Sequence, residues 1–439
     1  MMHTMELVSP AGNLEKLRYA WEYGADAAYI GLKNFSLRVK ADNFFTDEYK
    51  TISALKEHYA RQGTPKKLLC ALNISFHNDD IKAFLAEADY FRLYPIDAFI
   101  IQDIGMVSVL RKHFPHTPLH LSTQANCINY EAVRMYRDLG FTRVVLGREA
   151  SLADIAEIKS HVPEMELECF VHGAMCIAYS GRCLISAYLT GRSANAGACT
   201  HSCRWDYSLL AKKPSTDRGN AADAAALVDE EPSFAVEEKA RPGEYFPVEE
   251  GNGYTALFSS KDLCMIDYLA DLQKAGADAL KIEGRMKSLY YTALVTRAYR
   301  KRIDALSGKI DPAEAEPFVQ ELYNTAHREF GTGFYFSKDD ADKTTRGESK
   351  SPYGMAGTIG QQVSPNCYEF ISMNKITAGT PLEYIGPDIC AIKDTDYTLL
   401  DPDTGAAREW VCHGHPCLIR TEAPLRSGFI VRTRIGGAL

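Results

Sequence analysis

Eight short apolar runs alternate with segments of helical spacing along this chain, and this alternation constrains the fold more than any other feature. Between the runs, apolar residues recur three and four positions apart, and several segments end in a glycine before the next run. Strands that alternate with helices form parallel sheets. The pattern therefore predicts a (β/α)8 barrel of the TIM type, with a doubly wound sheet as the alternative. The runs are Glu6–Ser9, Ala27–Gly31, Lys67–Ile74, Ala98–Ile101, Leu119–Ser122, Arg143–Leu146, Leu167–Phe170 and Ala279–Ile282.

The sequence changes character after Pro352, where short alternating runs are separated by turn residues. This pattern is typical of a small all-β barrel. A chain of 439 residues can hold two or three domains. We expect a barrel domain from residues 1–207 and 234–310, a flexible insertion at 208–233, a connector at 311–352 and a β-barrel domain at 353–439 that could bind RNA.

The segment between the seventh and eighth runs is long and has three distinct parts. Residues 208–233 are rich in Ala, Asp and Pro and poor in aromatic residues, so we expect a flexible insertion there. The Gly251–Gly253 turn sequence predicts a hairpin. Further on, Ser260 is placed to cap a helix that carries Cys264.

The N-terminal sequence and the net charge of the chain indicate its cellular compartment and the kinds of partner it could bind. The first residues lack the basic start and apolar run of a signal peptide, and no apolar stretch reaches membrane-spanning length. We therefore expect a cytoplasmic protein without a membrane partner. The formal net charge of −8 does not indicate a nucleic-acid protein, but a local basic patch is compatible with it. The most basic short stretch consists of Arg297, Arg300, Lys301 and Arg302. These residues could contact RNA phosphates or could lie at a solvated helix end.

Polar side chains follow most of the eight apolar runs. In a (β/α)8 barrel the chemistry lies at the C-terminal ends of the strands, where the loops after the strands meet. Three arginines in these loops suit a substrate with carboxylates or phosphates, because a guanidinium pairs with either in a bidentate way, although each one alone could be a solvated loop charge. The residues past the runs are Ser9, Arg38, Asn73, Gln102, Asp103, Ser122, Gln124, Arg148, Glu149, His172, Glu283 and Arg285.

Two of these residues are candidate acid/base groups. Glu283 directly follows the last run. His172 lies four residues before Cys176, so it could neighbour a metal ligand, transfer protons, or only form a hydrogen bond at a strand end.

Five of the twelve cysteines fall between residues 168 and 203, at a density that indicates a metal site in a protein where disulfides are not expected. Cys176 and Cys183 are separated by a turn sequence, and Cys199 lies in a loop rich in Gly, Asn and Ser. Thiolates select zinc, copper(I) or an iron–sulfur cluster. The paired CxxC units of zinc knuckles and ferredoxins are missing, and the alternative is a set of small buried side chains, which Cys169 in its apolar strand fits.

Two further sets of cysteines stand outside this segment. Cys264 is a single cysteine, and such a residue on an apolar helix face is more often core, but the need for a fourth ligand favours it here. Cys412 and Cys417 flank two histidines, which is a weak zinc signal, and we favour the alternative that this His-rich loop binds no metal.

Motifs along nearly the whole chain resemble those of the collagenase-like peptidase family, a peptidase family of unknown mechanism. The signature around the cysteines consists of Glu168-x-Phe170, Gly173–Cys176, Gly181-x-Cys183 and Ile185–Ser186. The similarity extends to Ser36–Phe44, Cys203–Tyr207, Arg241–Glu250, Ser259–Asp267, Lys281–Ser288 and Arg328–Phe336.

The resemblance implies a function other than the family's name. Members with a barrel and one compact β-domain are associated with oxygen-independent hydroxylation of the tRNA wobble uridine to 5-hydroxyuridine, with prephenate as the implied hydroxyl source. Several relatives carry a [4Fe-4S] cluster. Carried over by position, the ligands are Cys176, Cys183, Cys199 and Cys264, with Cys203 in reserve.

In this interpretation Arg38, Arg148 and Arg285 hold prephenate at the barrel mouth, and Glu283 and His172 move protons at the uracil. The partners would be tRNA, prephenate and an electron donor or partner protein. The cluster would act as a Lewis acid or an electron carrier.

Two other functions compete with this one. The older family label indicates a peptidase, but the sequence has no HExxH or GxSxG motif and no triad signature, and a cysteine bound to a cluster is a poor nucleophile. A zinc-stabilised RNA-binding scaffold without chemistry is the other alternative.

Overall fold

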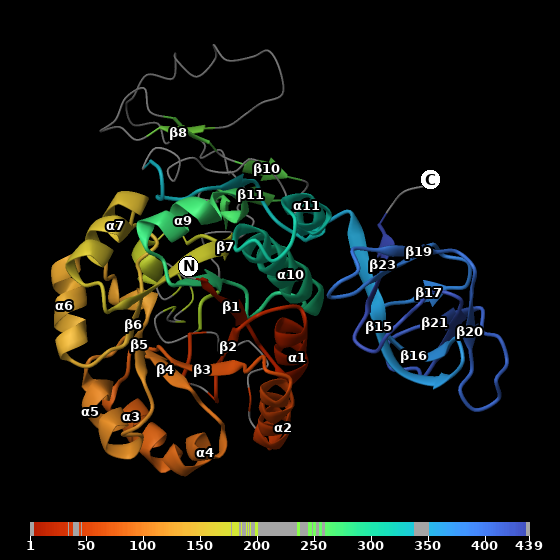
Figure 1. Ribbon diagram of the computed structural model, residues 1–439, viewed down its shortest axis with the longest axis horizontal. Helices are drawn as coiled ribbons and strands as arrows, with labels where there is room; N and C mark the ends of the chain where they lie inside the picture. Colours follow the sequence, from red (N-terminus) through yellow and green to blue (C-terminus); the bar gives the residue numbers. More distant parts are fainter. Residues whose placement is uncertain are drawn as a thin grey trace, which may run out of the picture.

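The computed structural model describes residues 4–33, 35–37, 44, 46–176, 178–183, 186, 190, 192, 194, 198–200, 260–337 and 351–435, together with the backbone of four short strands between 235 and 256. These residues form a barrel with surrounding helices and, beside it, an antiparallel sheet made by the C-terminal part of the chain (Figure 1). The expected insertion at 208–233 lies outside the described residues.

Eight parallel strands form a closed barrel. They pair in chain order, and β13 pairs with both β1 and β7, which closes the ring. The prediction of a (β/α)8 barrel is confirmed, and the doubly wound alternative is wrong. The strands are β1 (Glu6–Pro10), β2 (Ala27–Ile30), β3 (Lys67–Leu72), β4 (Ala98–Ile101), β5 (Leu119–Leu121), β6 (Arg143–Val145), β7 (Glu166–Ala174) and β13 (Ala279–Ile282).

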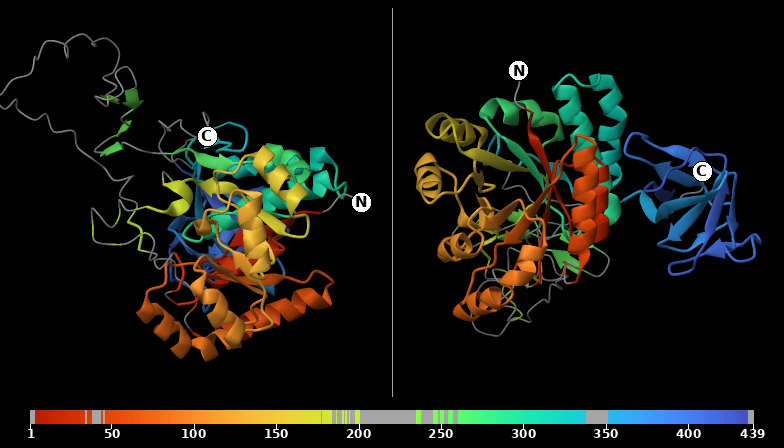
Figure 2. Two further views of the ribbon diagram at one scale, coloured as in Figure 1. Left: turned by 90° about the vertical axis from the view of Figure 1, so that its left-hand side faces the viewer. Right: turned by 60° about the horizontal axis from the view of Figure 1, so that its bottom comes forward.

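Helices cover the outside of the barrel (Figure 2). In α1, Leu17, Ala20 and Trp21 are buried on one face, and the Asn13 side chain caps the first turn by accepting from Lys16 N. The helices are α1 (Leu14–Glu22), α2 (Glu48–Arg61), α3 (Asn78–Ala86), α4 (Ala88–Leu93), α5 (Gly105–His113), α6 (Tyr130–Asp138), α7 (Leu152–His161), α9 (Leu269–Ala275), α10 (Leu289–Leu306) and α11 (Pro312–Gln320).

The interior of the barrel combines an apolar cluster with an ionic one. Val8, Tyr29, Leu69 and Ile100 belong to the apolar cluster. At the N-terminal ends of the strands, Arg143 forms ion pairs with three carboxylates, those of Glu6, Glu166 and Glu168. The barrel is therefore filled at this end, and any opening must lie at the C-terminal ends of its strands.

The structure differs from the sequence prediction where β7 runs on past the barrel to Ala174. This extension pairs in antiparallel fashion with β12 (Asp262–Cys264), which in turn pairs with β14 (Phe330–Gly331). Cys264 therefore lies on a strand, and the expected helix around it is wrong, because the edge of β7 offers unpaired backbone groups to this segment. Ser260 donates its hydroxyl to the Met175 carbonyl at 2.8 Å and caps no helix.

The hairpin expected around Gly251–Gly253 is confirmed. Strand β10 (Glu249–Gly251) pairs with β11 (Tyr254–Ala256) in antiparallel register. A second short pair joins β8 (Ala235–Glu237) to β9 (Tyr245–Pro247).

The C-terminal part of the chain forms an all-β unit, as the alternating pattern predicts. Seven strands make an antiparallel sheet in the order β19-β18-β23-β15-β16-β22-β20, and β17 pairs with β21. Their inward side chains form a separate core around Tyr368, Phe370, Tyr384 and Leu399. The strands are β15 (Tyr353–Ser364), β16 (Cys367–Ser372), β17 (Ile376–Thr377), β18 (Leu382–Ile385), β19 (Ile392–Asp394), β20 (Tyr397–Leu400), β21 (Trp410–Val411), β22 (Leu418–Thr421) and β23 (Ile430–Arg434).

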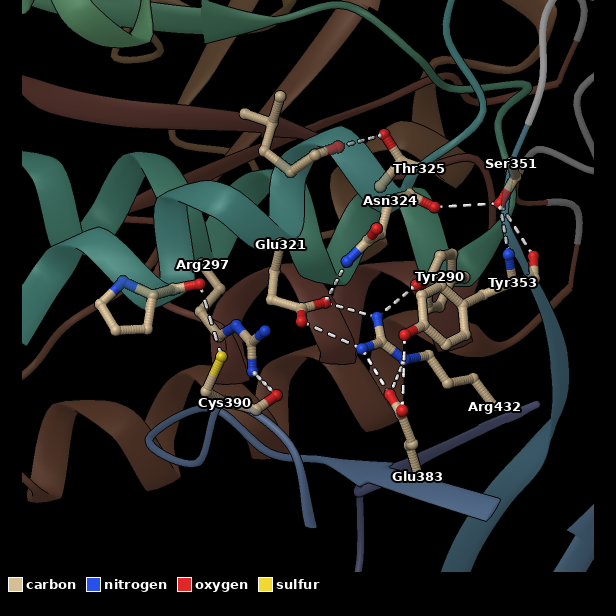
Figure 3. Close-up of polar contacts among 12 residues, drawn as sticks. Tyr290, Arg297, Glu321, Asn324, Thr325, Ser351, Tyr353, Glu383, Cys390 and Arg432 are labelled. Atoms are coloured by element: carbon tan, nitrogen blue, oxygen red, sulfur yellow. Dashed lines mark hydrogen bonds and ion pairs between the residues drawn. The ribbon is translucent and has the colours of Figure 1, made fainter. Parts of the chain in front are cut away.

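A joint of aromatic and ionic residues fixes this sheet against α1 and α10. Buried Arg432 of β23 forms ion pairs with Glu321 and, at 2.7 Å, with Glu383, and it donates to the Tyr290 hydroxyl at 2.8 Å (Figure 3). Its guanidinium also lies 3.7 Å above the Tyr353 ring. Every strong contact of this side chain is thus with a protein group at the joint.

The basic residues of α10 also make their contacts with other groups of the protein. Arg297 is buried and donates to the carbonyls of Gly386 and Ile389 at 2.6 and 2.8 Å. Arg300, Lys301 and Arg302 each pair with a carboxylate, those of Asp26, Asp388 and Asp267 among them. The structure therefore supports a structural role for these four residues over contact with RNA phosphates. No helix in the described parts of the chain is long and apolar enough to span a membrane.

Candidate active site

A cavity of about 470 Å³ opens at the C-terminal ends of the barrel strands. Its deeper walls come from the ends of the strands, through Tyr29, Ala71, Ile100 and Phe170, and its upper walls come from the loops that follow. A volume of this size holds a small organic ligand or a single nucleobase. The cavity is where the fold predicts an active site.

Among the described residues that line this cavity, cationic side chains outnumber carboxylates, five to two. An excess of positive charge in a concave site with low-dielectric walls attracts anions. The cations are Arg148, Lys281, Arg285, Lys287 and Arg328, and the carboxylates are Asp262 and Glu283.

Two of the three arginines that the sequence analysis selected line this cavity. Arg148 stacks its guanidinium 4.1 Å from the centre of the Phe170 ring and lies 3.5 Å from a Glu283 carboxylate oxygen. Arg285 is buried and donates to the Ser36 hydroxyl at 3.0 Å. Arg38, the third, lies outside the described residues.

Glu283 owes its position to a close approach between the ends of β7 and β13. Gly173 has a φ of +109°, and a Cβ there would come within 2.7 Å of the Glu283 carbonyl oxygen. Gly284, with a φ of +151°, faces the ring of Tyr291, whose hydroxyl donates to the same carbonyl at 2.8 Å. Glycine is the residue that fits both positions, and together they turn the Glu283 side chain into the cavity.

A neutral polar group forms another part of the lining. Asn73 donates to the Gln124 side-chain oxygen at 3.3 Å, and the Ser122 hydroxyl donates to the same oxygen. Gln102 supports this group by donating to the Asn73 carbonyl at 3.0 Å. Amides and hydroxyls of this kind can recognise the donors and acceptors on the edge of a base.

Four charged residues of the lining were missed in the sequence. Asp262 and Arg328 face each other, with Arg328 Nη2 2.6 Å from an Asp262 oxygen. Burial alone would raise the pKa of Asp262, but the Arg328 charge and hydrogen bonds hold that pKa below its usual value. Lys281 could have been selected as a candidate site residue from the sequence, because a lysine inside a buried strand is unusual. Lys287 and Arg328 follow no periodic pattern, so the sequence gives no sign of their place in the lining.

His172 does not belong to the residues that line the cavity. Its ring is buried against Tyr291, Tyr299 and Phe330, and its Nδ1 lies 3.4 Å from the Tyr299 hydroxyl. Burial lowers the pKa of His172 to about 3, so the imidazole is neutral. Of the three roles left open for this residue, the structure favours the hydrogen bonder at a strand end.

Three of the predicted metal ligands, Cys176, Cys183 and Cys199, line the cavity. The turn expected between the first two is present at Tyr179–Gly181, with Ser180 in the left-handed region at φ +39°. Glu149 holds this turn by accepting from the Ser180 backbone N–H at 2.5 Å and from its hydroxyl. The loop after β6 therefore positions the cysteine loop after β7.

The fourth predicted ligand, Cys264, lies on β12 and not in the cysteine loop after β7. It is buried on β12, its sulfur lies 3.9 Å from the Tyr299 hydroxyl, and it is not part of the cavity lining. Burial raises the pKa of its thiol to about 11, which disfavours the thiolate. Cys203, the reserve ligand, lies outside the described residues.

Within the described ranges, no three His, Cys, Asp or Glu side chains are grouped closely enough to hold a metal ion. The three cysteines share a cavity but are not assembled around one point. In the C-terminal sheet, Cys412 Sγ lies 3.2 Å from His415 Nδ1, and Cys417 is buried. The described residues there also form no group that could hold a metal ion.

Comparison with known proteins relates this chain to a peptidase family and to proteins named for RNA hydroxylation. Residues 12–345, which contain every residue of the lining, match the profile of peptidase family U32. The tRNA hydroxylation protein P of Escherichia coli is 38% identical over 406 residues, which cover 88% of this chain and 87% of that protein.

Two further relatives have different names. The 23S rRNA 5-hydroxycytidine C2501 synthase of Escherichia coli is 33% identical over 370 residues, 82% of this chain and 49% of that protein. An uncharacterized protease of Methanocaldococcus jannaschii is 35% identical over 340 residues, 76% of this chain and 74% of that protein.

Proposed function

Because this chain belongs to peptidase family U32, the collagenase-like family, and resembles RNA-hydroxylating members of it, we propose that it is a tRNA-hydroxylating enzyme with its active site in the barrel cavity. The reaction is the oxygen-independent conversion of the wobble uridine to 5-hydroxyuridine, with prephenate as the hydroxyl source. The observation that carries this proposal is the excess of cations in a cavity of ligand size at the C-terminal ends of the strands.

Prephenate is a dicarboxylate, and its binding requires fixed positive charges that remain in place after water has left. Arg148 and Arg285 meet this requirement, because both are largely buried and held by neighbouring groups. A guanidinium stays charged at every physiological pH and can donate two parallel hydrogen bonds to one carboxylate.

The uracil ring would enter the same cavity after leaving the stack of the anticodon loop, as substrates of base-modifying enzymes do. Asn73 and Gln124 offer amide groups for the edge of the base. Hydroxylation at C5 breaks a C–H bond and forms a C–O bond, which is a two-electron oxidation of the base. The C–O bond of prephenate would therefore break with its electron pair left on the prephenate carbon, and that carbon would take up a proton. The Glu283 carboxylate is placed to accept the proton that C5 releases, since it lines the cavity and lies against Arg148. His172, outside the lining, takes no part in this step.

A [4Fe-4S] cluster bound by Cys176, Cys183 and Cys199 is part of the proposal. The three thiols line the same cavity and are more exposed than the buried cysteines of the core, and thiolates are ligands that iron–sulfur clusters use. We propose Cys203 as the fourth ligand in place of Cys264. Cys203 follows Cys199 by only four positions along the chain, so the two cysteines lie at most about 14 Å apart. When bound, such a cluster supplies a Lewis-acid or electron-transfer centre, the latter with an electron donor or partner protein.

The test is the nucleoside profile of tRNA from a strain that lacks this protein. Restoring the wild-type gene should restore 5-hydroxyuridine, measured by mass spectrometry, and the Cys176→Ala and Cys183→Ala variants should not. Cys169→Ala, in a buried strand outside the cavity, is the matched control and should restore it. Unchanged nucleoside levels in the Cys176 and Cys183 variants would count against the proposal.

Peptide hydrolysis and a zinc-stabilised scaffold are the competing functions. One relative carries the name of a protease, but the described lining of the cavity contains no histidine to activate a cysteine or serine. Anaerobically purified protein should be brown and inactive on gelatin. A colourless, zinc-loaded protein would support the scaffold, and gelatin cleavage that Cys176→Ala abolishes would support the peptidase.

A further inference from the structure

Lys281 is a charged side chain inside the barrel and at the same time part of the cavity lining. Its ammonium lies 2.5 Å from the Glu168 carboxylate, 4.4 Å from the centre of the Tyr29 ring and 5.8 Å from that of Phe170. Lysine is almost never this buried unless it is paired. The pairing with Glu168 explains how Lys281 is tolerated but does not explain why it faces a cavity.

Glu168 has a second cationic partner. One of its oxygens accepts from Lys281 and the other accepts from Arg143 at 3.0 Å. Burial alone would raise the pKa of Glu168, but Lys281 and Arg143 hold it below its usual value, so the carboxylate remains charged. Glu168 therefore holds the Lys281 ammonium in a fixed place.

The ammonium also has spare hydrogen-bonding capacity. It carries three N–H donors, and among the described residues its only hydrogen-bond acceptor is Glu168. The aromatic rings of Tyr29 and Phe170 each offer a π-face to the ammonium but no strong acceptor. The remaining donors are available to a group that enters the cavity.

The register of β13 places Lys281 below the other charged groups of this wall. It precedes Glu283 by two residues, so it lies about 7 Å deeper along the strand. Arg285 comes after the strand, in the loop at the rim. The cavity wall therefore presents cations at two levels, one at the floor and one at the rim.

We propose that Lys281 is a specificity-determining residue that binds the most deeply inserted anionic group of the organic-acid cosubstrate. This inference rests on the proposed function and deepens it, because it assigns the floor of the cavity to the acid and leaves the uracil nearer the mouth. A cosubstrate that lacks an acidic group at that end would leave the Lys281 donors desolvated and unpaired, and the site would reject it.

A charge-balanced double variant separates this role from a structural one. Lys281→Gln alone leaves Glu168 with only Arg143 and could destabilise the barrel. Lys281→Gln with Glu168→Gln removes both charges and keeps an amide at each position. If Lys281 serves only to neutralise Glu168, the double variant regains both stability and ligand binding; if Lys281 binds the acid, it regains stability alone.

The experiment measures prephenate binding to the full-length protein by calorimetry, beside thermal melts and tRNA binding. For the double variant we expect prephenate affinity to fall about 10- to 100-fold, with tRNA affinity and melting temperature close to wild type. The matched control removes another lysine–carboxylate pair of the barrel, outside the cavity lining, by Lys159→Gln with Asp278→Asn, and should bind prephenate normally.

Two results would overturn the inference, and they differ in what else they overturn. If the double variant binds prephenate within about twofold of wild type, Lys281 has no role in recognition while the proposed function stands. If the wild-type protein itself binds no prephenate and hydroxylates no tRNA, the proposed function fails and the role of Lys281 fails with it.

Discussion

The joint between the two domains and the cavity of the barrel use the same residue types in opposite ways. At the joint, Arg432 lies between two carboxylates, a phenol and an aromatic ring, and nothing of its guanidinium is left for a ligand (Figure 3). Among the described residues that line the cavity there are five cations and two carboxylates, and Lys281 has a further carboxylate partner in Glu168. The number of carboxylates around each arginine separates a structural cation from one that is available to a ligand.

The two regions should therefore respond differently to loss of a charge. Removing a cation from the joint leaves buried carboxylates without a partner, which costs folding free energy. Removing a cavity cation that does not neutralise a fully buried carboxylate, such as Arg148, reduces a charge excess, which costs ligand affinity and little stability. Four predictions test this difference, in order of decreasing effect.

Arg432→Gln should cause the largest loss, about 3–5 kcal/mol of unfolding free energy, because Glu321 and Glu383 lose their common partner. Urea denaturation of the full chain measures it. Arg434→Gln on the same strand is the control, since that side chain contacts the hydroxyl and the ring of Tyr353 at 3.4 and 5.5 Å, and it should change stability by less than about 0.5 kcal/mol. A loss below about 1 kcal/mol for Arg432→Gln would show that the joint does not depend on this residue.

Arg148→Gln should reduce activity and leave stability nearly unchanged. We expect kcat/KM for prephenate to fall about 10- to 100-fold, which corresponds to the loss of a charge-assisted hydrogen bond, with unfolding free energy within about 1 kcal/mol of wild type. Steady-state kinetics with tRNA and prephenate, beside urea denaturation, measure both quantities. A variant that is destabilised yet keeps its kcat/KM would place Arg148 with the structural arginines.

The joint should weaken in acid. Burial alone would raise the pKa of Glu321, but hydrogen bonds to Arg432 and the charge of that residue hold this pKa below its usual value. A carboxylate with a depressed pKa stabilises the folded state above its unfolded pKa, and this contribution disappears as the pH falls through the folded value. Glu321→Gln should therefore lower stability by about 1–2 kcal/mol at pH 7 and by less at pH 3. An equal loss at both pH values would contradict the assignment.

Tyr23→Phe should have the smallest effect. The Tyr23 hydroxyl donates to the carbonyls of Ile385 and Gly428, at 2.9 and 3.1 Å, from α1 to the C-terminal sheet. Its loss should cost about 1 kcal/mol in a thermal or urea melt and leave tRNA hydroxylation unchanged. A marked loss of hydroxylation would mean that the joint influences the cavity.

The fold was predictable from the sequence because each barrel strand is marked by its own apolar run and by a glycine or polar group at its end. The cavity was predictable in part for the same reason: Arg148, Glu283 and Arg285 immediately follow strands, and strand ends converge in this fold. Cys176 and Cys183 were recognisable from the turn sequence between them.

Other features depend on pairing between distant segments and leave no local signal. Cys264 lies on a strand because β12 pairs with the extension of β7, whereas its own sequence suits a helix. Arg328 reaches the cavity through β14, which pairs with β12 from beyond α11. His172 follows the strand pattern of its neighbours, but the aromatic side chains that bury it come from α10 and β14.

The most direct test of the account follows the oxygen atom. Prephenate whose hydroxyl carries a heavy oxygen isotope is incubated anaerobically with the purified protein and tRNA that lacks the modification, and the nucleosides are analysed by mass spectrometry. We predict that the heavy isotope appears in 5-hydroxyuridine with the wild-type protein and that Arg148→Gln forms little of the product. A hydroxyl group that carries the oxygen of water, or equal product from both proteins, would contradict the assignment of the cavity as the site of this reaction.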